Sequence, residues 1–271
     1  MGQNEGMALT ALAVLDGQIL PADEATIPVT DTGLLRGDGV FEVIRVYGGL
    51  PFAMDDHLRR MANSAKNLRL EIDLSAVRAD TEALLAEAGP VDGAVRFFVT
   101  RGGRRVGLVE TVPAHDQPLT LTSVEYVPPR VLDGVKSLSY AGNMLAKRLA
   151  EEAGGDDALL VTPHGRVLEG TTSSLFASLD GETLVTPPLS DRVLDSITRR
   201  RLLAMLPGAR EEVITREELR GAREAFLAST TREVQAIARI DEDELPEAPG
   251  PLTQAAADAF AAHVRETLSA A

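Results

Sequence analysis

Two consecutive prolines, Pro128 and Pro129, interrupt the chain near its middle. Proline has no backbone N–H and fixes φ, so a proline pair ends a helix or a central strand and is typical of a linker. The 271 residues are enough for two domains of modest size. We therefore expect an N-terminal domain over residues 1–127, a linker over 128–132 and a C-terminal domain over 133–271.

Both halves mix hairpin signals with helix signals. The turn dipeptides Asp16-Gly17 and Gly48-Gly49 each join two apolar segments, which is typical of a β-hairpin. Apolar residues recur at helical spacing over residues 55–68, which open on an aspartate. Further helices are predicted over 73–88, 143–152, 195–206 and 251–270. Because strands and helices do not alternate strictly, the pattern favours a mixed α/β fold over a parallel doubly wound one.

Composition argues against several classes of partner. The net charge is −14 and no long basic run occurs, so the chain repels nucleic acid and anionic membranes. No apolar run approaches the roughly 18 residues of a membrane span, and residues 1–17 lack the features of a signal peptide. The absence of cysteine excludes disulfides, thiolate metal sites and a cysteine nucleophile. We expect a cytoplasmic protein without a bound metal.

Glycine-rich and lysine positions differ in the chemistry that they suggest. The stretch Arg36-Gly37-Asp38-Gly39 lacks the context of a dinucleotide-binding fingerprint. Of 27 basic residues, only Lys66, Lys136 and Lys147 are lysines. The first and last of these lie in predicted amphipathic helices, where a solvated position is the simple interpretation. Lys136 follows a predicted turn. Taken alone it is more often structural, but an amine can condense with a carbonyl compound, which a permanently protonated guanidinium cannot do.

Other residues of the chain suit pyridoxal phosphate. Glu169 ends a predicted strand before Gly-Thr-Thr-Ser-Ser, and the ring nitrogen of this cofactor requires an acidic partner. The cofactor phosphate requires amides at a helix start, hydroxyl groups and an arginine. Candidates for these roles are Ile197 and Thr198 at a predicted helix start, Ser229, Thr230 and Thr231 in a turn, and Arg60.

Six stretches in order carry a resemblance to a known family. They span residues 31–47, 56–66, 135–147, 155–176, 184–199 and 227–234. In these stretches the chain resembles the class IV, or fold-type IV, pyridoxal-phosphate-dependent aminotransferases. That family includes branched-chain and D-amino acid aminotransferases, R-selective amine transaminases and aminodeoxychorismate lyases. The resemblance implies a homodimer of two-domain α/β subunits, each with pyridoxal 5'-phosphate between its domains.

The resemblance also implies roles for individual residues. Lys136 matches the lysine that forms a Schiff base with the cofactor, and Glu169 matches the partner of the ring nitrogen. Arg60, in the pattern H-x-x-R-x-x-x-S, matches the phosphate arginine, with neighbouring Arg59 as the alternative. The other cofactor-binding residues implied are Tyr140, Ser173, Ile197, Thr198, Thr230 and Thr231. A Ser-Asn pair usual in the family is Ser173-Ser174 here, so a side-chain amide contact is lost or replaced.

The implied activity is transfer of an amino group between an amino acid or amine and a 2-keto acid, with Lys136 as general base. The alternative is an aminodeoxychorismate lyase that yields 4-aminobenzoate and pyruvate with the same lysine and glutamate. The stretch from Glu42 to Arg45 resembles the aminotransferases more closely. A non-catalytic protein that has kept the fold is a third possibility, which the presence of both Lys136 and Glu169 disfavours.

Arginines are the candidates for binding a substrate carboxylate. Arg104 and Arg105 follow a predicted strand, where D-amino acid enzymes carry such an arginine, although the loop here is shorter and a solvated loop is equally consistent. Arg45 is a second candidate, because its stretch resembles that of branched-chain enzymes. Phe41 of the same stretch is assigned to the substrate side. The choice between L-amino acids, D-amino acids and amines stays open.

Overall fold

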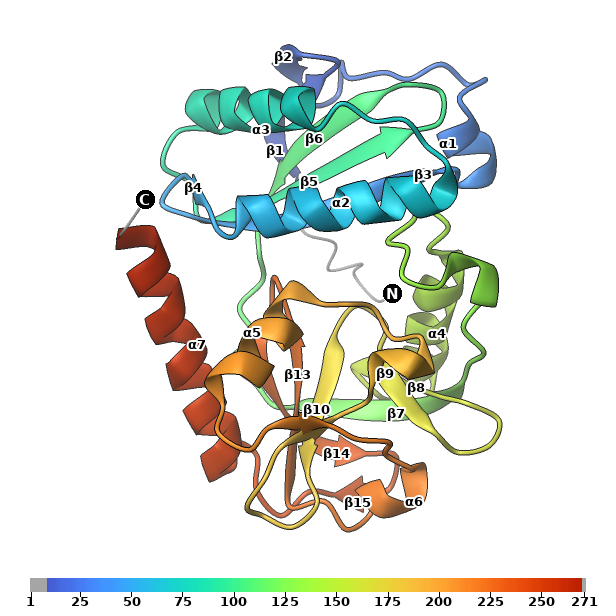
Figure 1. Ribbon diagram of the computed structural model, residues 1–271, viewed down its shortest axis with the longest axis vertical. Coiled ribbons are helices and arrows are strands. Elements are labelled where there is room, and N and C mark those ends of the chain that lie inside the picture. The colour runs from blue at the N-terminus through green and yellow to red at the C-terminus, as the bar shows by residue number, and fades with distance from the viewer. Residues whose placement is uncertain (1–8, 270–271) are drawn as a thin grey trace. The chain divides into compact units, whose positions relative to one another are not determined.

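The computed structural model describes residues 9–269 and divides into two compact units (Figure 1). Unit 1 contains the described residues up to 114 together with 135–140, and unit 2 contains residues 115–134 and those from 141 onward. Within residues 9–269, no helix combines the length and the apolar character needed to cross a membrane. The expectation about a signal peptide concerns residues 1–17, of which 1–8 lie outside the described part.

The units do not follow the boundaries expected from the proline pair. Residues 115–127 contain β7 (Leu119–Glu125), which joins unit 2 because it pairs in parallel with β8 (Asp157–Val161) and β14 (Glu233–Ile240). Pro128 and Pro129 therefore follow a strand inside unit 2 rather than separate the units. Residues 135–140 join unit 1, since Leu138 N donates to the carbonyl of Gly39 at 3.0 Å and Phe41 N donates to that of Lys136 at 3.2 Å.

Two glycines allow residues 135–140 to approach so closely. A Cβ atom on Gly39 would lie 2.6 Å from a methyl group of Leu138. Gly37 has a φ of +65°, and a Cβ there would lie 2.9 Å from the Ser139 hydroxyl. A side chain at either position would push the segment away, so Arg36-Gly37-Asp38-Gly39 serves close packing of the backbone.

Unit 1 is built on a six-stranded antiparallel sheet in the order β2-β1-β6-β5-β3-β4. Its strands are β1 (Leu9–Leu15), β2 (Gln18–Pro21), β3 (Gly39–Tyr47), β4 (Leu50–Pro51), β5 (Gly93–Thr100) and β6 (Arg105–Glu110). Its helices are α1 (Thr32–Arg36), α2 (Met54–Leu68) and α3 (Leu74–Ala88). The hairpins and the two longer helices agree with the sequence-based predictions, whereas α1 was not predicted.

The strands of unit 1 alternate between two faces of the sheet. Val40 and Ile44 of β3 and Phe97 of β5 point to one face, where they pack with buried apolar side chains of α2 and α3. That core explains the helical spacing of apolar residues in α2, because they must all face the sheet. The intervening residues, Phe41 and its neighbours at every second position, project from the opposite face.

Unit 2 is built on a nine-stranded mixed sheet in the order β12-β11-β10-β13-β14-β7-β8-β9, with β15 pairing with β14. Its remaining strands are β9 (Val167–Gly170), β10 (Ser174–Ser178), β11 (Val185–Thr186), β12 (Arg210–Glu211), β13 (Glu224–Ser229) and β15 (Asp243–Glu244). Its helices are α4 (Ala141–Glu152), α5 (Ile197–Met205), α6 (Arg216–Leu219) and α7 (Pro251–Ser269), with 3-10 turns over Arg130–Leu132 and Leu189–Asp191. The mixed α/β prediction is confirmed.

Strand register in unit 2 brings two turns together. β10 and β13 are antiparallel, with Ser174 opposite Ala228. The turn over 171–173, which precedes β10, therefore lies next to the turn over 230–232, which follows β13. Both turns carry residues that the sequence assigns to cofactor binding.

Candidate active site

Hydrogen bonds to the backbone of Lys136 attach this residue to β3 and α2. Its N–H donates to the hydroxyl of Ser64 on α2 at 3.1 Å, and its carbonyl accepts from Phe41. Its amine lies 4.2 Å from the centroid of the Phe41 ring and 5.6 Å from that of Tyr140. These two rings meet edge to face with centroids 5.3 Å apart. The structure thus brings together three of the residues predicted for the site, and it places Lys136 in unit 1 rather than in the C-terminal half.

Arg60 lies on the buried face of α2 and is fixed by one carboxylate. Its Nε donates to Glu42 Oε1 at 2.8 Å and its Nη2 donates to Oε2 at 2.6 Å. His57 Nδ1 lies 2.8 Å from the same Oε2. His57, Arg60 and Ser64 are spaced so that they share one face of a helix, which explains the H-x-x-R-x-x-x-S pattern physically. Arg59, by contrast, is an exposed residue paired with Asp56.

The charges in this cluster are mutually dependent. Burial alone would raise the pKa of Glu42, but the charge and hydrogen bonds of Arg60, with help from His57, lower it to about 2. Burial lowers the pKa of His57, against the opposing effect of its hydrogen bond to Glu42. His57 is therefore neutral at neutral pH. Since ionised Glu42 only accepts hydrogen bonds, the ring proton must be on Nδ1.

Arg45 is bound by the backbone at the far end of β3. Its Nη1 donates to the carbonyls of Val46 at 2.8 Å and Gly93 at 2.6 Å. It projects from the same sheet face as Phe41, but four residues along a strand correspond to about 13 Å. The structure therefore does not bring Arg45 close to Phe41.

Arg104 and Arg105 are both paired with carboxylates of unit 1. Arg104 Nη1 donates to Asp16 at 2.7 Å, and Arg105 Nε donates to Asp80 of α3 at 2.9 Å. Arg105 lies opposite Val99 in the β5–β6 register, so it projects toward the helix-covered face. Phe41 projects from the other face, and the structure separates Arg105 from it.

Arg96 is an arginine that the sequence reasoning missed. It pairs with Val43 in the β3–β5 register, which places it on the same face as Phe41. Its guanidinium carbon lies 5.9 Å from the Phe41 ring centroid, and its Nε donates to Glu110 at 2.6 Å. Arg96 thus lies over one of the two aromatic rings that are close to the Lys136 amine.

Glu169 ends β9 in unit 2 and is oriented by the segment before α5. Its Oε1 accepts a hydrogen bond from Leu194 N at 3.1 Å. Burial raises the pKa of the Tyr126 hydroxyl, and the negative charge of Glu169 raises this pKa further. The Glu169 carboxylate therefore accepts from a backbone amide and lies near a phenol that stays neutral.

Several hydroxyl groups of unit 2 are buried close to chain turns or to the helix start. Thr198 is in the first turn of α5, whose N-cap is Ser196, and the amides of Ile197 and Thr198 have no acceptor within the helix. Within residues 9–269, the buried Ser173 hydroxyl has no hydrogen-bond partner. Thr230 and Thr231 lie in a turn closed by a hydrogen bond from Arg232 N to the Ser229 hydroxyl at 3.2 Å.

Comparison with known families shows to which family the chain belongs. The family model described as amino-transferase class IV matches residues 39–240. The chain belongs to the class IV aminotransferases. This confirms the resemblance on which the sequence interpretation rested.

Relatives of known name are similar to this class IV aminotransferase over most of its length. The D-alanine aminotransferase of Bacillus licheniformis is 32% identical over 266 residues, covering 89% of this chain and 93% of that protein. A putative branched-chain-amino-acid aminotransferase of Methanocaldococcus jannaschii is 35% identical over 251 residues, covering 84% and 87%. Both names describe aminotransferases.

Solved structures confirm the fold. A fold IV transaminase from Curtobacterium pusillum matches with a TM-score of 0.84 at 27% identity, covering 97% of this chain and 100% of that one. A hypothetical aminotransferase from Mycobacterium tuberculosis, in its alpha-ketoglutarate and PMP bound form, matches with a TM-score of 0.85 at 26% identity, covering 94% and 99%. This aminotransferase is accordingly a pyridoxal-phosphate-dependent enzyme of fold type IV.

The side chains of this class IV aminotransferase fit that cofactor. A helix start with a buried threonine hydroxyl suits a phosphate group. The buried Ser173 hydroxyl is a donor for which the described chain offers no acceptor, and such a group in a native protein calls for a partner. In unit 1, Arg60 is a donor oriented by two hydrogen bonds. In unit 2, Glu169 is an acceptor oriented by a backbone amide.

Two supporting residues, Glu42 and His57, also escaped the sequence interpretation as site residues. A signal for Glu42 was present, because Val40 and Ile44, which share its face in a predicted strand, are apolar, and a carboxylate buried among such residues requires a charged partner. The identity of that partner depends on the helical phase of α2 relative to the sheet, which a local pattern does not specify.

We predict that Glu42→Gln destabilises the protein in a pH-dependent way. The pKa of Glu42 falls from 4.5 to about 2 on folding, so ionised Glu42 adds stability that is present above pH 4.5 and lost as the pH falls through 2. The shift corresponds to about 3 kcal/mol. Urea unfolding of both proteins should show a gap in unfolding free energy that is largest near pH 7 and narrows toward pH 3. The exposed substitution Glu87→Gln on α3 is the control, and a gap that does not change with pH would contradict the prediction.

Proposed function

We propose that Lys136 is the catalytic amine of this aminotransferase and that Glu169 and Arg60 orient the cofactor. The observation that carries the proposal is the environment of the amine, which lies beside two aromatic rings on a backbone that is hydrogen-bonded on both sides. The other lysines differ. Lys66 is exposed on α2, and Lys147 forms an ion pair with Glu151 at 2.8 Å on the surface of α4.

The proposed roles follow from what each side chain can do. Bound pyridoxal phosphate supplies an electron sink for the bonds of the substrate α-carbon. Glu169 keeps a proton on the ring nitrogen, because a carboxylate fixed by the Leu194 amide favours a positive charge beside it. Lys136 takes the proton from the substrate α-carbon at its Nζ and returns it during transfer.

Each unit, taken by itself, carries groups that suit a phosphate. In unit 1, Glu42 uses two hydrogen bonds to fix the plane of the Arg60 guanidinium, which suits a group with several oxygens. In unit 2, the first-turn amides of α5 and the hydroxyls of Thr198 and Thr231 favour an anion. We assign Tyr140, Ser173 and Thr230 to the cofactor as well, as the family resemblance implies.

We predict that Lys136→Ala abolishes transamination, with a loss of at least about 10²–10⁴-fold, the range for a general base. Lys147→Ala and Lys66→Ala are matched controls and should retain activity. Borohydride reduction of the holoenzyme followed by peptide mapping tests the assignment directly. A pyridoxyl group found on Lys66 or Lys147 would show that the assignment is wrong.

We further propose that the amino donor is an aliphatic amino acid whose carboxylate binds Arg96. The names of the two relatives above share this chemistry, since alanine and the branched-chain amino acids are aliphatic. Arg96 shares a sheet face and a ring contact with Phe41, whereas Arg45 is engaged by two carbonyls and Arg105 faces α3. Arg104, paired with Asp16, is the second choice. The lyase alternative finds no support among these relatives.

A substrate panel with D-alanine, L-leucine and R-1-phenylethylamine tests the donor proposal. We expect turnover of an amino acid and slow reaction of the amine, which lacks a carboxylate. Arg96→Met should lower kcat/KM for amino acids by about 10- to 100-fold, as for the loss of a hydrogen bond to a charged group. Arg105→Met is the matched control, because it breaks a comparable ion pair on the other face. An equal loss for the amine and the amino acids would contradict a role in carboxylate binding.

We propose, finally, that the enzyme is a homodimer, as the family resemblance implies. Unit 1 exposes three large apolar side chains close together in sequence, with Val29 76%, Leu34 57% and Leu35 62% exposed. Light scattering of active enzyme should give twice the mass of the chain, and Leu35→Asp should lower that mass. Active protein with the mass of a single chain would contradict the proposal.

A further inference from the structure

Asp157 is a fully buried carboxylate at the first position of β8. Its Oδ1 accepts from the hydroxyl of Thr171 at 2.6 Å and from the amide of Ala158 at 2.8 Å. Its Oδ2 accepts from Arg232 Nη2 at 2.8 Å. One carboxylate thus joins the turn before β10 to the turn after β13.

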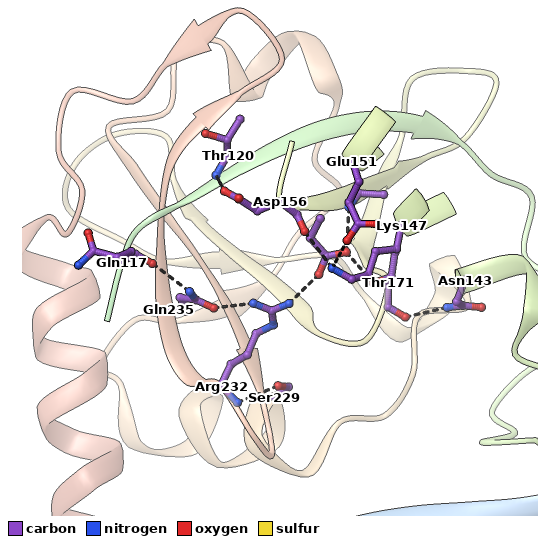
Figure 2. Close-up of polar contacts among 12 residues, drawn as sticks. Gln117, Thr120, Asn143, Lys147, Glu151, Asp156, Thr171, Ser229, Arg232 and Gln235 are labelled. Atoms are coloured by element: carbon purple, nitrogen blue, oxygen red, sulfur yellow. Dashed lines mark hydrogen bonds and ion pairs between the residues drawn. The ribbon is translucent and has the colours of Figure 1, made fainter. Parts of the chain in front are cut away.

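Arg232 extends the connection in the other direction. Its Nη1 donates to Gln235 Oε1 at 2.5 Å, and Gln235 Nε2 donates to the carbonyl of Gln117 before β7 at 2.9 Å, as Figure 2 shows. Its backbone N–H closes the turn on the Ser229 hydroxyl. The Arg232 side chain is only 13% exposed. Both ends of its guanidinium fork are therefore engaged, and the direction of the side chain is determined.

Thr171 is held from two sides. Besides its hydroxyl bond to Asp157, its carbonyl accepts from Asn143 Nδ2 of α4 at 2.8 Å (Figure 2). Thr171 is two residues from Glu169 and two residues from Ser173. The segment that carries the proposed partner of the ring nitrogen is therefore tied to the segment that carries Thr230 and Thr231.

A buried ion pair is weak evidence of a gain in stability. Well-packed apolar residues are often as stabilising as such a pair, because both charges must leave water. What the pair does supply is direction, since the carboxylate and the guanidinium accept and donate only along defined lines. Here the hydrogen bonds of Asp157 reach the turn over 171–173 and the turn over 230–232. The proposed function requires these two turns to be placed correctly relative to each other.

We propose that Arg232 and Asp157 are positioning residues of the cofactor site. Their ion pair sets the distance between the turn over 171–173 and the turn over 230–232, and so determines the affinity for the cofactor phosphate. The inference rests on the proposed function, because it uses the assignments of Ser173, Thr230 and Thr231 to the cofactor.

The test compares two variants that each remove the guanidinium of Arg232. The double variant Arg232→Met with Asp157→Asn removes both charges and leaves no unpaired ion. Arg232→Lys keeps the positive charge beside Asp157 but cannot also reach Gln235. The control is Arg216→Met with Asp241→Asn. It removes an ion pair of 2.9 Å whose carboxylate directly follows the end of β14, whereas Arg232 directly precedes its start. Binding of pyridoxal phosphate, and of pyridoxal without the phosphate, is titrated against each apoprotein.

We expect both Arg232 variants to bind pyridoxal phosphate about 10- to 100-fold more weakly, which is the range for losing one hydrogen bond to a charged group. Affinity for pyridoxal should change far less, and the control should bind both compounds as the wild type does. Wild-type affinity in either Arg232 variant would overturn the inference, as would equal losses for both compounds. If instead the wild type failed to fix pyridoxal phosphate on Lys136 with borohydride, the proposed function itself would fail.

Discussion

Main-chain hydrogen bonds between residues 136–138 and the start of β3 determine where the amine of Lys136 lies. The carbonyl of Lys136 accepts from Phe41, Leu138 donates to Gly39, and the Lys136 amide donates to Ser64. With the backbone fixed on both sides, only the side-chain torsions remain free, and two aromatic rings restrict these. The residues assigned to chemistry in unit 1 are thus positioned by the same hydrogen bonds that attach this segment to the sheet.

Each unit contains a buried carboxylate that directs an arginine. Glu42 is 1% exposed and holds Arg60, and Asp157 is fully buried and holds Arg232. An unpaired buried charge would be costly, so each carboxylate also accepts from a further group, His57 in one unit and Thr171 in the other. Both arginines lie on segments to which phosphate contacts are assigned. Direction of polar groups, rather than net stability, is the common physical purpose we infer.

Local signals predicted the elements well and their assembly less well. The spacing of apolar residues over 55–68 predicted α2, and the turn dipeptides predicted the hairpins. The proline pair indicated a break in secondary structure, but it did not reveal that β7 pairs with β8 and β14 or that residues 135–140 return to β3. Pairing of that kind depends on residues far apart in the chain. Arg96 was missed for the same reason, since its proximity to Phe41 follows from strand register alone.

The chain has three lysines, and its cationic side chains serve two different roles, which are holding other groups in place and reacting with a carbonyl carbon. Arg60 and Arg232 each bind through two nitrogens at once, which a planar guanidinium does and an ammonium group cannot do. Lys136 is assigned a reaction in which nitrogen must lose its proton and attack a carbonyl carbon, which a guanidinium cannot do in the usable pH range. The arginines around the proposed site therefore hold groups in place, and the amine is the cation that can change its bonding. An arginine at position 136 would keep the charge and lose the chemistry.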